Sequence, residues 1–398
     1  MIDLWQLLLV FTAIAIGWWL GRRGRMISAD NNAALHHQYY RGLNFLINDK
    51  PDSALDTFIE ALEVNAETLE THIAVGNLMR RKGEVERAIR IHQNLLSRPS
   101  LPRVHLHQAH LELARDFISA GLLDRAERLL QDLIKEASEL KETAMHHLLE
   151  IYKDEKEWQQ AIDIAEQLLP KRSLLKAAPA TDKTITSALS HYCCELAELS
   201  LRKNDFHGAR TQLKKALSYD RGCVRASLLF ADIEFRTGHY AKAIKNLRKV
   251  REQDPVFIPE TIALLRSSYE RLGDSEGFYH SMLECLEIYP SATIVLSLVE
   301  EITAKKGQQA AADFLAKELK KRPSLLGLTK LVEFHIANSD GQSKENLTIL
   351  QLLIEQLMQN KPRYQCDHCG FSVKRLHWLC PSCKQWGQIK AIRGAEGD

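Results

Sequence analysis

The clearest chemistry in this chain belongs to two pairs of cysteines near its carboxyl terminus. The sequence reads C-D-H-C over residues 366–369 and C-P-S-C over residues 380–383. Two C-x-x-C turns in this arrangement can place four thiolates around one tetrahedral metal ion. The predicted ligands of one metal ion are therefore Cys366, Cys369, Cys380 and Cys383.

The residues beside these cysteines favour a metal site. Gly370 follows the first pair and Pro381 lies inside the second, and both suit tight turns whose backbone N–H groups point back at the sulfurs. A four-sulfur tetrahedral site suits either zinc or a single iron, and the ligands do not choose between them. Iron would permit redox chemistry, but the sequence offers no second cofactor site, so electron transfer ranks low.

The same four cysteines could instead form two disulfides, and the cellular compartment decides between the two possibilities. Seventeen residues without a charge run from Leu4 to Leu20, enough to span about 26 Å as a helix. A secretory signal needs a basic segment before the apolar run and a small-residue cleavage site after it. Here Asp3 precedes the run, so the sequence predicts an uncleaved membrane anchor over residues 1–21.

Basic residues after the anchor predict its orientation. Arg22, Arg23 and Arg25 begin a basic juxtamembrane linker over residues 22–34. Because positive residues beside a membrane segment stay on the cytoplasmic side, the rest of the chain is expected in the cytoplasm, where thiols are reduced. A peripheral amphipathic helix is the alternative to a spanning anchor.

The middle of the chain has the composition of a helical globular protein. Of the 398 residues, 45% are hydrophobic and 26% are charged, and the formal net charge is only +2, so no nucleic-acid partner is expected. Apolar residues recur at steps of three and four, and long alternating runs typical of strands are absent. The predicted fold class is therefore all-α.

Self-similarity indicates which all-α fold this is. Small residues recur, mostly 34 or 35 residues apart, where two helices of a hairpin would cross, and Phe278 occupies the same place in one further hairpin. This spacing resembles tetratricopeptide repeats, which stack into a superhelix. The aligned residues are Ala54, Ala88, Ala126, Ala161, Ala209, Ala243 and Ala312.

The repeat pattern also predicts the domain boundaries. About eight tetratricopeptide-like hairpins are expected over residues 35–323, with an insertion near 170–190 that is expected to be a flexible joint or a binding loop. A final helical hairpin is expected over 324–361 and a metal-binding domain over 362–398. That last domain is too small to fold without its metal. Its aromatic residues are expected to pack it onto the last helices, and they are Tyr364, Phe371, Trp378 and Trp386.

A stack of such hairpins has a concave surface that is lined by the first helix of each repeat and usually holds peptides or proteins. The alternative for each polar residue on this surface is that it is merely solvated. Partner-binding residues are predicted from the repeat register at Tyr39, Asn77, Arg80, Arg115, Glu150, Glu198 and Asp232.

The sequence gives no indication of catalysis. It lacks the phosphate-binding G-x-x-x-x-G-K-[ST], the zinc-protease H-E-x-x-H, the hydrolase G-x-S-x-G and the dinucleotide-binding G-x-G-x-x-G patterns. His107 and His110 could share a helix face but have no acidic partner in register, so exposed histidines are expected. The remaining cysteines lie at small or apolar helix positions and are expected to pack there, at Cys193, Cys194, Cys223 and Cys285.

Taken together, the three parts resemble a known family. An amino-terminal anchor followed by arginines, a run of tetratricopeptide-like repeats and a closing rubredoxin-like C-D-H-C-G-F … C-P-S-C element look like the lipopolysaccharide assembly protein B family of Gram-negative bacteria. Repeats and C-x-x-C pairs are each common, but their combination in this order is specific. The resemblance covers essentially the whole chain.

The resemblance implies a function as well as a fold. It implies a non-catalytic inner-membrane adaptor that limits lipopolysaccharide synthesis by working with the membrane protease FtsH in degrading the deacetylase LpxC. Other inner-membrane lipopolysaccharide proteins are possible partners, and the family's metal cysteines correspond to the four named above, with iron or zinc bound. The main alternative is a general protein-assembly or co-chaperone factor that holds peptide-like clients in the groove. A redox or RNA-binding protein acting through the ribbon is a third reading.

Overall fold

A computed structural model describes residues 12, 14–19, 57, 69–97, 102–170, 183–359, 361–395 and 397. Residues 14–19 are helical, but no helix within the described residues combines the length and the hydropathy needed to cross a membrane. Of the predicted anchor over residues 1–21, the structure describes only residues 12 and 14–19, so most of the anchor lies outside the described residues. The same holds for the basic linker with Arg22, Arg23 and Arg25, for Tyr39 and for Ala54.

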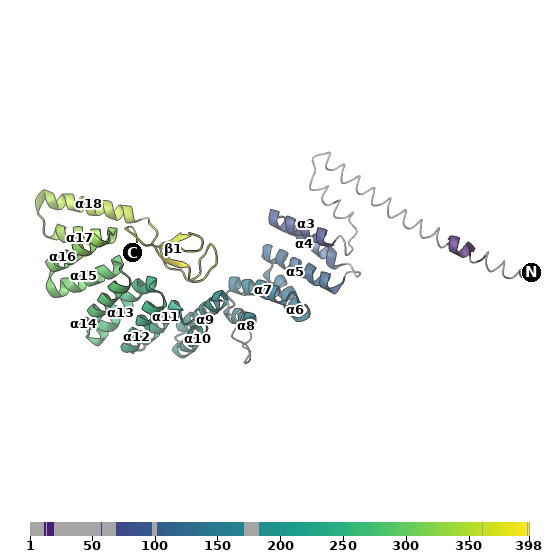
Figure 1. Cartoon of the computed structure of the whole chain (residues 1–398), viewed down its shortest axis with the longest axis horizontal. Coiled ribbons are helices and arrows are strands. Elements are labelled where there is room, and N and C mark those ends of the chain that lie inside the picture. Colours follow the sequence, from purple (N-terminus) through teal and green to yellow (C-terminus); the bar gives the residue numbers. More distant parts are fainter. Residues whose placement is uncertain are drawn as a thin grey trace, which may run out of the picture. The chain divides into compact units, whose positions relative to one another are not determined.

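The chain divides into two compact units, which meet in sequence after Glu155. From Leu69 onward, the described part of the first unit consists of helices that pair with their neighbours along the chain (Figure 1). These helices are α3 (Leu69–Lys82), α4 (Val85–Leu96), α5 (Arg103–Ser119), α6 (Leu123–Glu136) and α7 (Lys141–Glu155).

The second unit continues the helical array and adds the cysteine ribbon. Its first helices are α8 (Trp158–Leu168), α9 (Lys183–Arg202), α10 (Phe206–Tyr219), α11 (Val224–Arg236) and α12 (Tyr240–Gln253). A short 3-10 helix, η1 (Pro255–Phe257), leads into α13 (Ile258–Leu272), α14 (Ser275–Ile288), α15 (Ala292–Lys306) and α16 (Gln308–Lys321). The last helices are α17 (Leu325–Ala337) and α18 (Gly341–Gln359).

Small residues occupy one fixed position of the array, as the repeat spacing predicts. From α4 to α16, the fourth residue of each second helix is buried and is an alanine, except that α14 carries Phe278 there. The last member is Ala311, so the predicted Ala312 was wrong by one residue. Three consecutive alanines, 310–312, make that position ambiguous in the sequence, and α16 beginning directly after Gly307 settles it. The buried set is Ala88, Ala126, Ala161, Ala209, Ala243 and Ala311.

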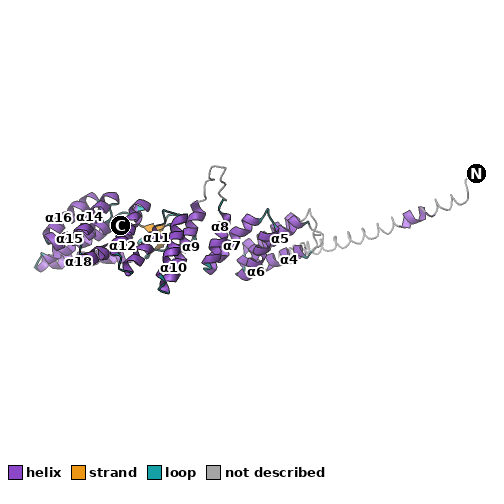
Figure 2. Ribbon diagram, turned by 90° about the horizontal axis from the view of Figure 1, so that it is seen from below, coloured by secondary structure: helices purple, strands orange, loops and turns teal. Residues whose placement is uncertain are grey.

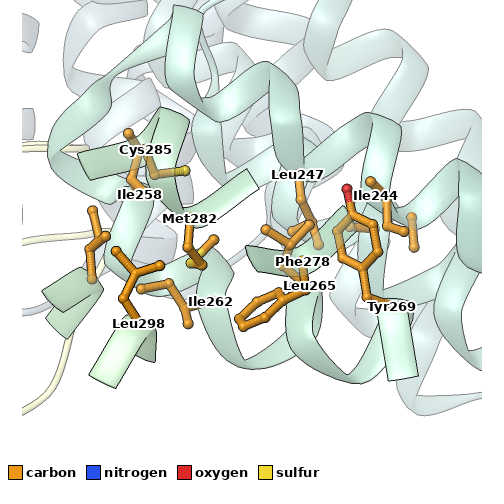
Figure 3. Packing of buried hydrophobic residues seen from close by; sticks show 13 residues of the cluster. Ile244, Leu247, Ile258, Ile262, Leu265, Tyr269, Phe278, Met282, Cys285 and Leu298 are labelled. Carbon is orange, nitrogen blue, oxygen red and sulfur yellow. The ribbon is translucent and has the colours of Figure 1, made fainter. Parts of the chain in front are cut away.

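Phe278 shows how the array tolerates a large residue at the small position. Its ring is 2% exposed and lies within the buried cluster drawn in Figure 3. The ring meets Tyr269 edge to face at 6.1 Å between centroids, and the Arg266 guanidinium lies 4.9 Å above it. The ring is thus stabilised by burial and by favourable aromatic and cation–π contacts.

Local signals set where the second helices begin. Asp205 accepts a hydrogen bond from the Gly208 N–H at 2.9 Å, and Asp274 accepts one from the Gly277 N–H at 2.8 Å. Each aspartate thereby caps a helix and satisfies an amide that the helix itself leaves unpaired. Before the second cap, Gly273 adopts φ 70°, a left-handed conformation that closes α13 at little cost for glycine.

Part of the predicted insertion is helical. Helix α9 begins at Lys183 and runs for 20 residues, so residues 183–190 extend a helix and do not form the expected flexible joint or binding loop. Residues 171–182 lie outside the description. The same helix carries His191 and Tyr192, directly after this stretch, and both contact the ribbon as described below.

The carboxyl-terminal ribbon holds the strands of the described chain (Figure 2). Strand β1 (Tyr364–Cys366) lies between β2 (Ser372–Val373) and β3 (Ile389–Ala391), and both pairings are antiparallel. In this register Cys366 faces Ile389. The structure is therefore a mostly helical repeat array with a small four-cysteine ribbon at its end.

Candidate metal centre

The ribbon brings its four cysteines together. The sulfur atoms of Cys366, Cys369, Cys380 and Cys383 all lie within 4.8 Å of one another. The Cys366–Cys383 and Cys369–Cys380 Sγ–Sγ distances are both 3.7 Å. A metal bound at about 2.3 Å by four tetrahedral sulfurs gives an S–S edge of about 3.8 Å, whereas a disulfide bond is about 2.05 Å long. The donor set and spacing therefore fit one tetrahedral metal ion.

Backbone N–H groups in the two turns point at the sulfurs. The amides of His368 and Cys369 hydrogen-bond to the Cys366 sulfur, and the Gln385 amide bonds to that of Cys383. Such donors stabilise thiolates, the form in which cysteine binds a metal. Around the Cys369 sulfur, the Phe371 amide lowers the pKa of the thiol to about 6.

The centre is sheltered on one side and open on the other. Cys366 and Cys380 are at most 2% exposed, packed with Ile389, whereas Cys369 is exposed. Cys366 and Cys380 would therefore hold an ion from the sheltered side, with Cys369 near solvent. Zinc and iron both fit, because sulfur donors in a tetrahedron suit each of them.

The ribbon docks on the helices of its own unit through Trp386. The indole stacks on the His191 ring at 4.9 Å between centroids and meets Tyr192 and Trp158 edge to face at 5.9 and 6.1 Å. The Arg225 guanidinium lies 5.8 Å from the same ring. Trp386 is thus enclosed by residues of α8, α9 and α11 and is 8% exposed.

A second tryptophan extends this contact toward η1. Trp378 stacks on Phe257 at 5.4 Å and, with Leu376, packs against a buried cluster that includes Val224 and Val250. The prediction that aromatic residues attach the ribbon to the helices is therefore confirmed for these two tryptophans. The predicted docking surface was wrong. The tryptophans contact α8 to α12 and η1 rather than the last helices, and Phe371 stays 38% exposed.

Polar contacts frame the aromatic dock. The Tyr364 hydroxyl donates to Glu260 on α13 at 2.6 Å, and Lys390 pairs with Asp254 at 3.0 Å. Beyond β3, the Leu325 N–H donates to the Ala395 carbonyl at 2.8 Å, which ties the end of the ribbon to the start of α17. The ribbon is therefore held along its length by helices that are distant in sequence.

Burial changes the acid–base behaviour of the dock. Loss of solvent, together with the charge of Arg225, lowers the pKa of His191 to about 3. Its Nδ1 atom is buried and makes no hydrogen bond within the described chain. At neutral pH the ring is therefore uncharged, which suits a face that stacks on an indole.

The predicted groove residues of the second unit are already paired. Glu198 accepts from Arg225 at 2.6 Å, and Glu195 accepts from the same guanidinium at 2.8 Å. Asp232 pairs with Arg236 one helical turn further on at 2.8 Å. Glu198 thus orients the arginine beneath Trp386, a role that its spacing in the sequence could not indicate.

In the first unit the structure gathers three predicted groove residues around one acid. Glu112 accepts from Arg80 at 2.8 Å and from Arg115 at 2.9 Å, and Arg80 also donates to Asn77 at 2.6 Å. Burial alone would raise the pKa of Glu112, but the two arginines outweigh it and lower that pKa. The remaining predicted residue, Glu150, is 56% exposed at its side chain and pairs with Lys153 on its own helix.

This network continues into the helices through residues that the sequence did not indicate. Arg80 reaches Asp116 at 2.7 Å, and Asp116 also contacts His92 Nδ1 at 2.5 Å. Both Asp116 and His92 are fully buried. Gly76 leaves the room for that imidazole, since a Cβ there would lie 2.4 Å from His92 Nε2.

The histidines of α5 have an acidic neighbour after all. His107 lies 3.3 Å from Glu139, which lies between α6 and α7 and is distant in sequence. The prediction that His107 lacks an acidic partner was wrong, because it considered only residues of the same helix. Half-burial, together with nearby His107, lowers the pKa of His110.

The remaining cysteines pack inside the array, as predicted. Cys193, Cys194, Cys223 and Cys285 are at most 4% exposed. Burial raises the pKa of Cys193 to about 12 and that of Cys194 well above its usual value. The Cys194 and Cys223 sulfurs are 4.0 Å apart, and a hydrogen bond from Cys194 lowers the pKa of Cys223 to about 7.

Comparison with known proteins covers both the parts and the whole. Residues 364–391 match the model of a rubredoxin metal-binding domain, and residues 200–266 match that of a tetratricopeptide repeat. The chain is 36% identical over 392 residues to lipopolysaccharide assembly protein B of Escherichia coli strain K12, with 98% of each chain covered. It is 35% identical over 406 residues to the protein of that name from Haemophilus influenzae, with 100% of each covered.

Among solved structures, a tetratricopeptide repeat protein from Parabacteroides merdae aligns with 73% of this chain and 99% of its own. The identity is 15% and the TM-score is 0.33. That score is too low to carry an assignment, which depends instead on the full-length relatives and on the two domain models.

Proposed function

This chain belongs to the lipopolysaccharide assembly protein B family, and we propose on that premise that it is a non-catalytic inner-membrane adaptor. Membership implies a role in lipopolysaccharide assembly. In the proposed mechanism the chain brings the deacetylase LpxC to the membrane protease FtsH, so that LpxC is degraded and lipopolysaccharide synthesis is limited. The observation that carries the proposal is the relationship to the family over the full length of the chain.

A cleft beside the ribbon supports the binding of a polypeptide. It has a volume of about 1130 Å³ and lies between the ribbon and helices α13, α15, α17 and α18. The helices contribute the acids Glu260, Glu300 and Glu333 and the base Lys330, and the ribbon side contributes bases at Arg363 and Lys374. A mainly acidic wall opposite a basic one suits a segment with mixed charge.

The amino-terminal segment supports tethering to the inner membrane. Its seventeen uncharged residues, Leu4–Leu20, are followed by Arg22, Arg23 and Arg25, which favour a cytoplasmic location for the repeats and the ribbon. A tether raises the effective concentration of the adaptor beside another membrane protein. In this proposal the anchor contacts the protease, and the repeats bind the client.

The metal is proposed to serve structure. When bound, the ion supplies the cross-link that lets a ribbon of this size fold. Cys366, Cys369, Cys380 and Cys383 would hold it, and Trp378 and Trp386 then fasten the folded ribbon to the helices. Either iron or zinc would stabilise the ribbon, and this structural role requires no change in the oxidation state of the metal.

A reconstituted proteolysis assay tests the proposed function. FtsH in lipid vesicles is supplied with LpxC, with and without the full chain, and the LpxC remaining is followed over time. The adaptor proposal expects faster loss of LpxC when the chain is present and no loss when the chain is present without FtsH. Equal rates with and without the chain would reject the proposal. Promotion of FtsH cleavage across unrelated substrates would favour the co-chaperone alternative.

A shortened chain tests the tether separately. A form that begins at Ser28 lacks the anchor and its arginines and is expected to remain folded but to lose its effect on LpxC degradation. Binding of LpxC by that form, measured by co-sedimentation, should persist because the proposed client surface lies on the repeats. Undiminished stimulation of proteolysis without the anchor would contradict the tethering mechanism.

A further inference from the structure

The last helix of the array exposes an unusual amount of apolar surface. Of the large hydrophobic side chains that are exposed in the described chain, five lie on α18, more than on any other described helix. Repeat arrays normally end in a helix with a polar outer face, because no further repeat covers it. The exposed fractions are 56% for Ile349, 43% for Leu350, 54% for Leu352, 52% for Leu353 and 63% for Leu357.

Four of these residues form one continuous row. At about 100° per residue, Ile349, Leu350, Leu353 and Leu357 fall within a sector of roughly 100° on the helix surface, the width of a typical buried stripe. We call them the α18 row. Ile354, the buried residue of α18, lies outside this sector, on the side that packs toward α17. The apolar part of α18 is therefore wider than its contact with α17 covers.

We propose that the α18 row is the interface with a second copy of this chain. Two α18 helices would pack antiparallel around a two-fold axis at Leu353. The spacing of the row suits this axis, since Ile349 lies four residues before it and Leu357 four residues after it. Leu353 then meets Leu353 of the partner subunit, and Ile349 meets Leu357 of the partner subunit on both sides of the axis.

The charges around the row favour a second copy over other occupants. The polar residues that share its sector, Gln342 and Asn346, are uncharged, and the nearest charged residue of α18, Glu345, lies about 40° outside it. At about 100° per residue, Lys344 and Glu355 lie on the side of the helix opposite the α18 row. A charged peptide finds no counter-charge here, and a lipid surface finds no basic residues beside the apolar ones. A second copy brings the same uncharged apolar row.

The exposed area is sufficient for a small two-fold interface. The four side chains leave roughly 400 Å² of apolar surface exposed on each copy, within the range of functional surface patches. With the polar neighbours included, an antiparallel helix pair buries on the order of 1,000 Å² in total, near the lower limit for a specific interface. The dimer is therefore expected to dissociate in the micromolar range.

Sedimentation of the full chain tests this interface. The wild-type chain is expected to pass from its monomer mass of 45.4 kDa to twice that mass as its concentration rises through the micromolar range. Leu353→Glu and Leu353→Lys each place like charges together at the two-fold axis and should weaken dimerisation at least a hundredfold. The matched control is Leu272→Glu on α13, where the leucine is similarly exposed at 48%, and it should leave dimerisation unchanged.

Mixing the two charged variants separates this geometry from a general loss of folding. Equal amounts of Leu353→Glu and Leu353→Lys should restore dimers to within about tenfold of the wild type, because opposite charges then meet at the axis. The proposal is overturned if the wild-type chain remains monomeric at 100 µM or above, a concentration about a hundredfold over the micromolar scale expected here. It is equally overturned if Leu353→Glu leaves the dimer intact or if the mixture fails to restore it.

Discussion

The two units use a similar arrangement of charges on their first helices, but within the described residues the ribbon lies over only one of them. In the first unit Arg80 of α3 joins Glu112 and Asp116, which lie one turn apart on α5. In the second unit Arg225 of α11 joins Glu195 and Glu198, one turn apart on α9. An arginine bound by two acids of another first helix therefore occurs twice in the array.

The difference lies in what covers the arginine. The Arg225 side chain is 4% exposed because Trp386 of the ribbon lies over it, whereas that of Arg80 is 13% exposed. In the second unit the metal ribbon thus occupies surface that a repeat protein ordinarily offers to a partner. The comparison shows that the ribbon covers the arginine of the second unit, whereas in the described part of the first unit the corresponding arginine is covered by helix residues alone.

Loss of the metal should have the largest effect, because it should remove the ribbon that covers Arg225 in the second unit. Replacing Cys366 and Cys369 with serine removes two of four ligands, and structural zinc sites contribute on the order of 10 kcal/mol to the folding of such small domains. The ribbon is expected to unfold and to uncover Arg225. Elemental analysis should find no bound metal, and tryptophan emission should shift to longer wavelength as Trp378 and Trp386 become solvated. Retention of one metal ion per chain would contradict the four-cysteine assignment.

Removing the indole while keeping the metal should undock the ribbon more mildly. Trp386→Ala deletes a ring that is buried against His191, Tyr192 and Trp158, and such truncations cost about 3–5 kcal/mol. The ribbon should keep its metal but become sensitive to limited proteolysis near β3. Phe371→Ala is the matched control, since this ring is 38% exposed and should contribute little. Equal protease sensitivity of both variants would show that Trp386 does not fasten the ribbon.

Removing the uncovered arginine should destabilise the first unit alone. Arg80→Met leaves Asp116, which is fully buried, without its guanidinium partner, and breaking a buried pair in this way costs about 3 kcal/mol. Hydrogen exchange should accelerate in α3 and α5 but remain unchanged in α9 and α11. Arg115→Met is the control, because this arginine is 43% exposed and its ion pair contributes little. Unchanged exchange in α5 would indicate that the Arg80 network does not support the fold.

The smallest expected effect is a dependence of docking on pH. Because the pKa of His191 is lowered to about 3, the folded dock excludes a proton that the free imidazole binds below about 6.5. The resulting stability is complete above that pH and is lost progressively as the pH falls toward 3. Between pH 7.5 and 5.5 the loss is about 1 kcal/mol, measurable by urea unfolding followed through tryptophan emission. His191→Phe keeps an aromatic stack and should remove this dependence, whereas an unchanged pH profile would argue against a buried neutral His191.

The sequence indicates the parts of this molecule that local spacing determines. The helical repeats follow from small residues at regular intervals, and the four cysteines follow from two C-x-x-C turns. The register error at Ala312 has the same origin, because three adjacent alanines satisfy the pattern equally well. Phe278 appears as an exception in the sequence and as a well-packed core residue in the structure.

Contacts between distant segments could not be predicted in this way. His191, Arg225 and Trp158 resemble ordinary helix residues, and only the fold brings them to Trp386, more than a hundred residues later. Glu198 was predicted as a partner-binding residue, yet its carboxylate holds Arg225. A possible signal was the pair of acids three residues apart on a first helix, which recurs at a similar spacing in α5.

Hydrogen exchange across the whole chain, compared between the wild type and the Cys366→Ser, Cys369→Ser variant, tests most directly the claim that a metal-held ribbon occupies the groove of the second unit. The account predicts faster exchange in α9, α11 and η1 of the variant, where the ribbon docks, and unchanged exchange in α3 to α6. Unchanged protection of α9 and α11 in a variant that has lost its metal would contradict the account.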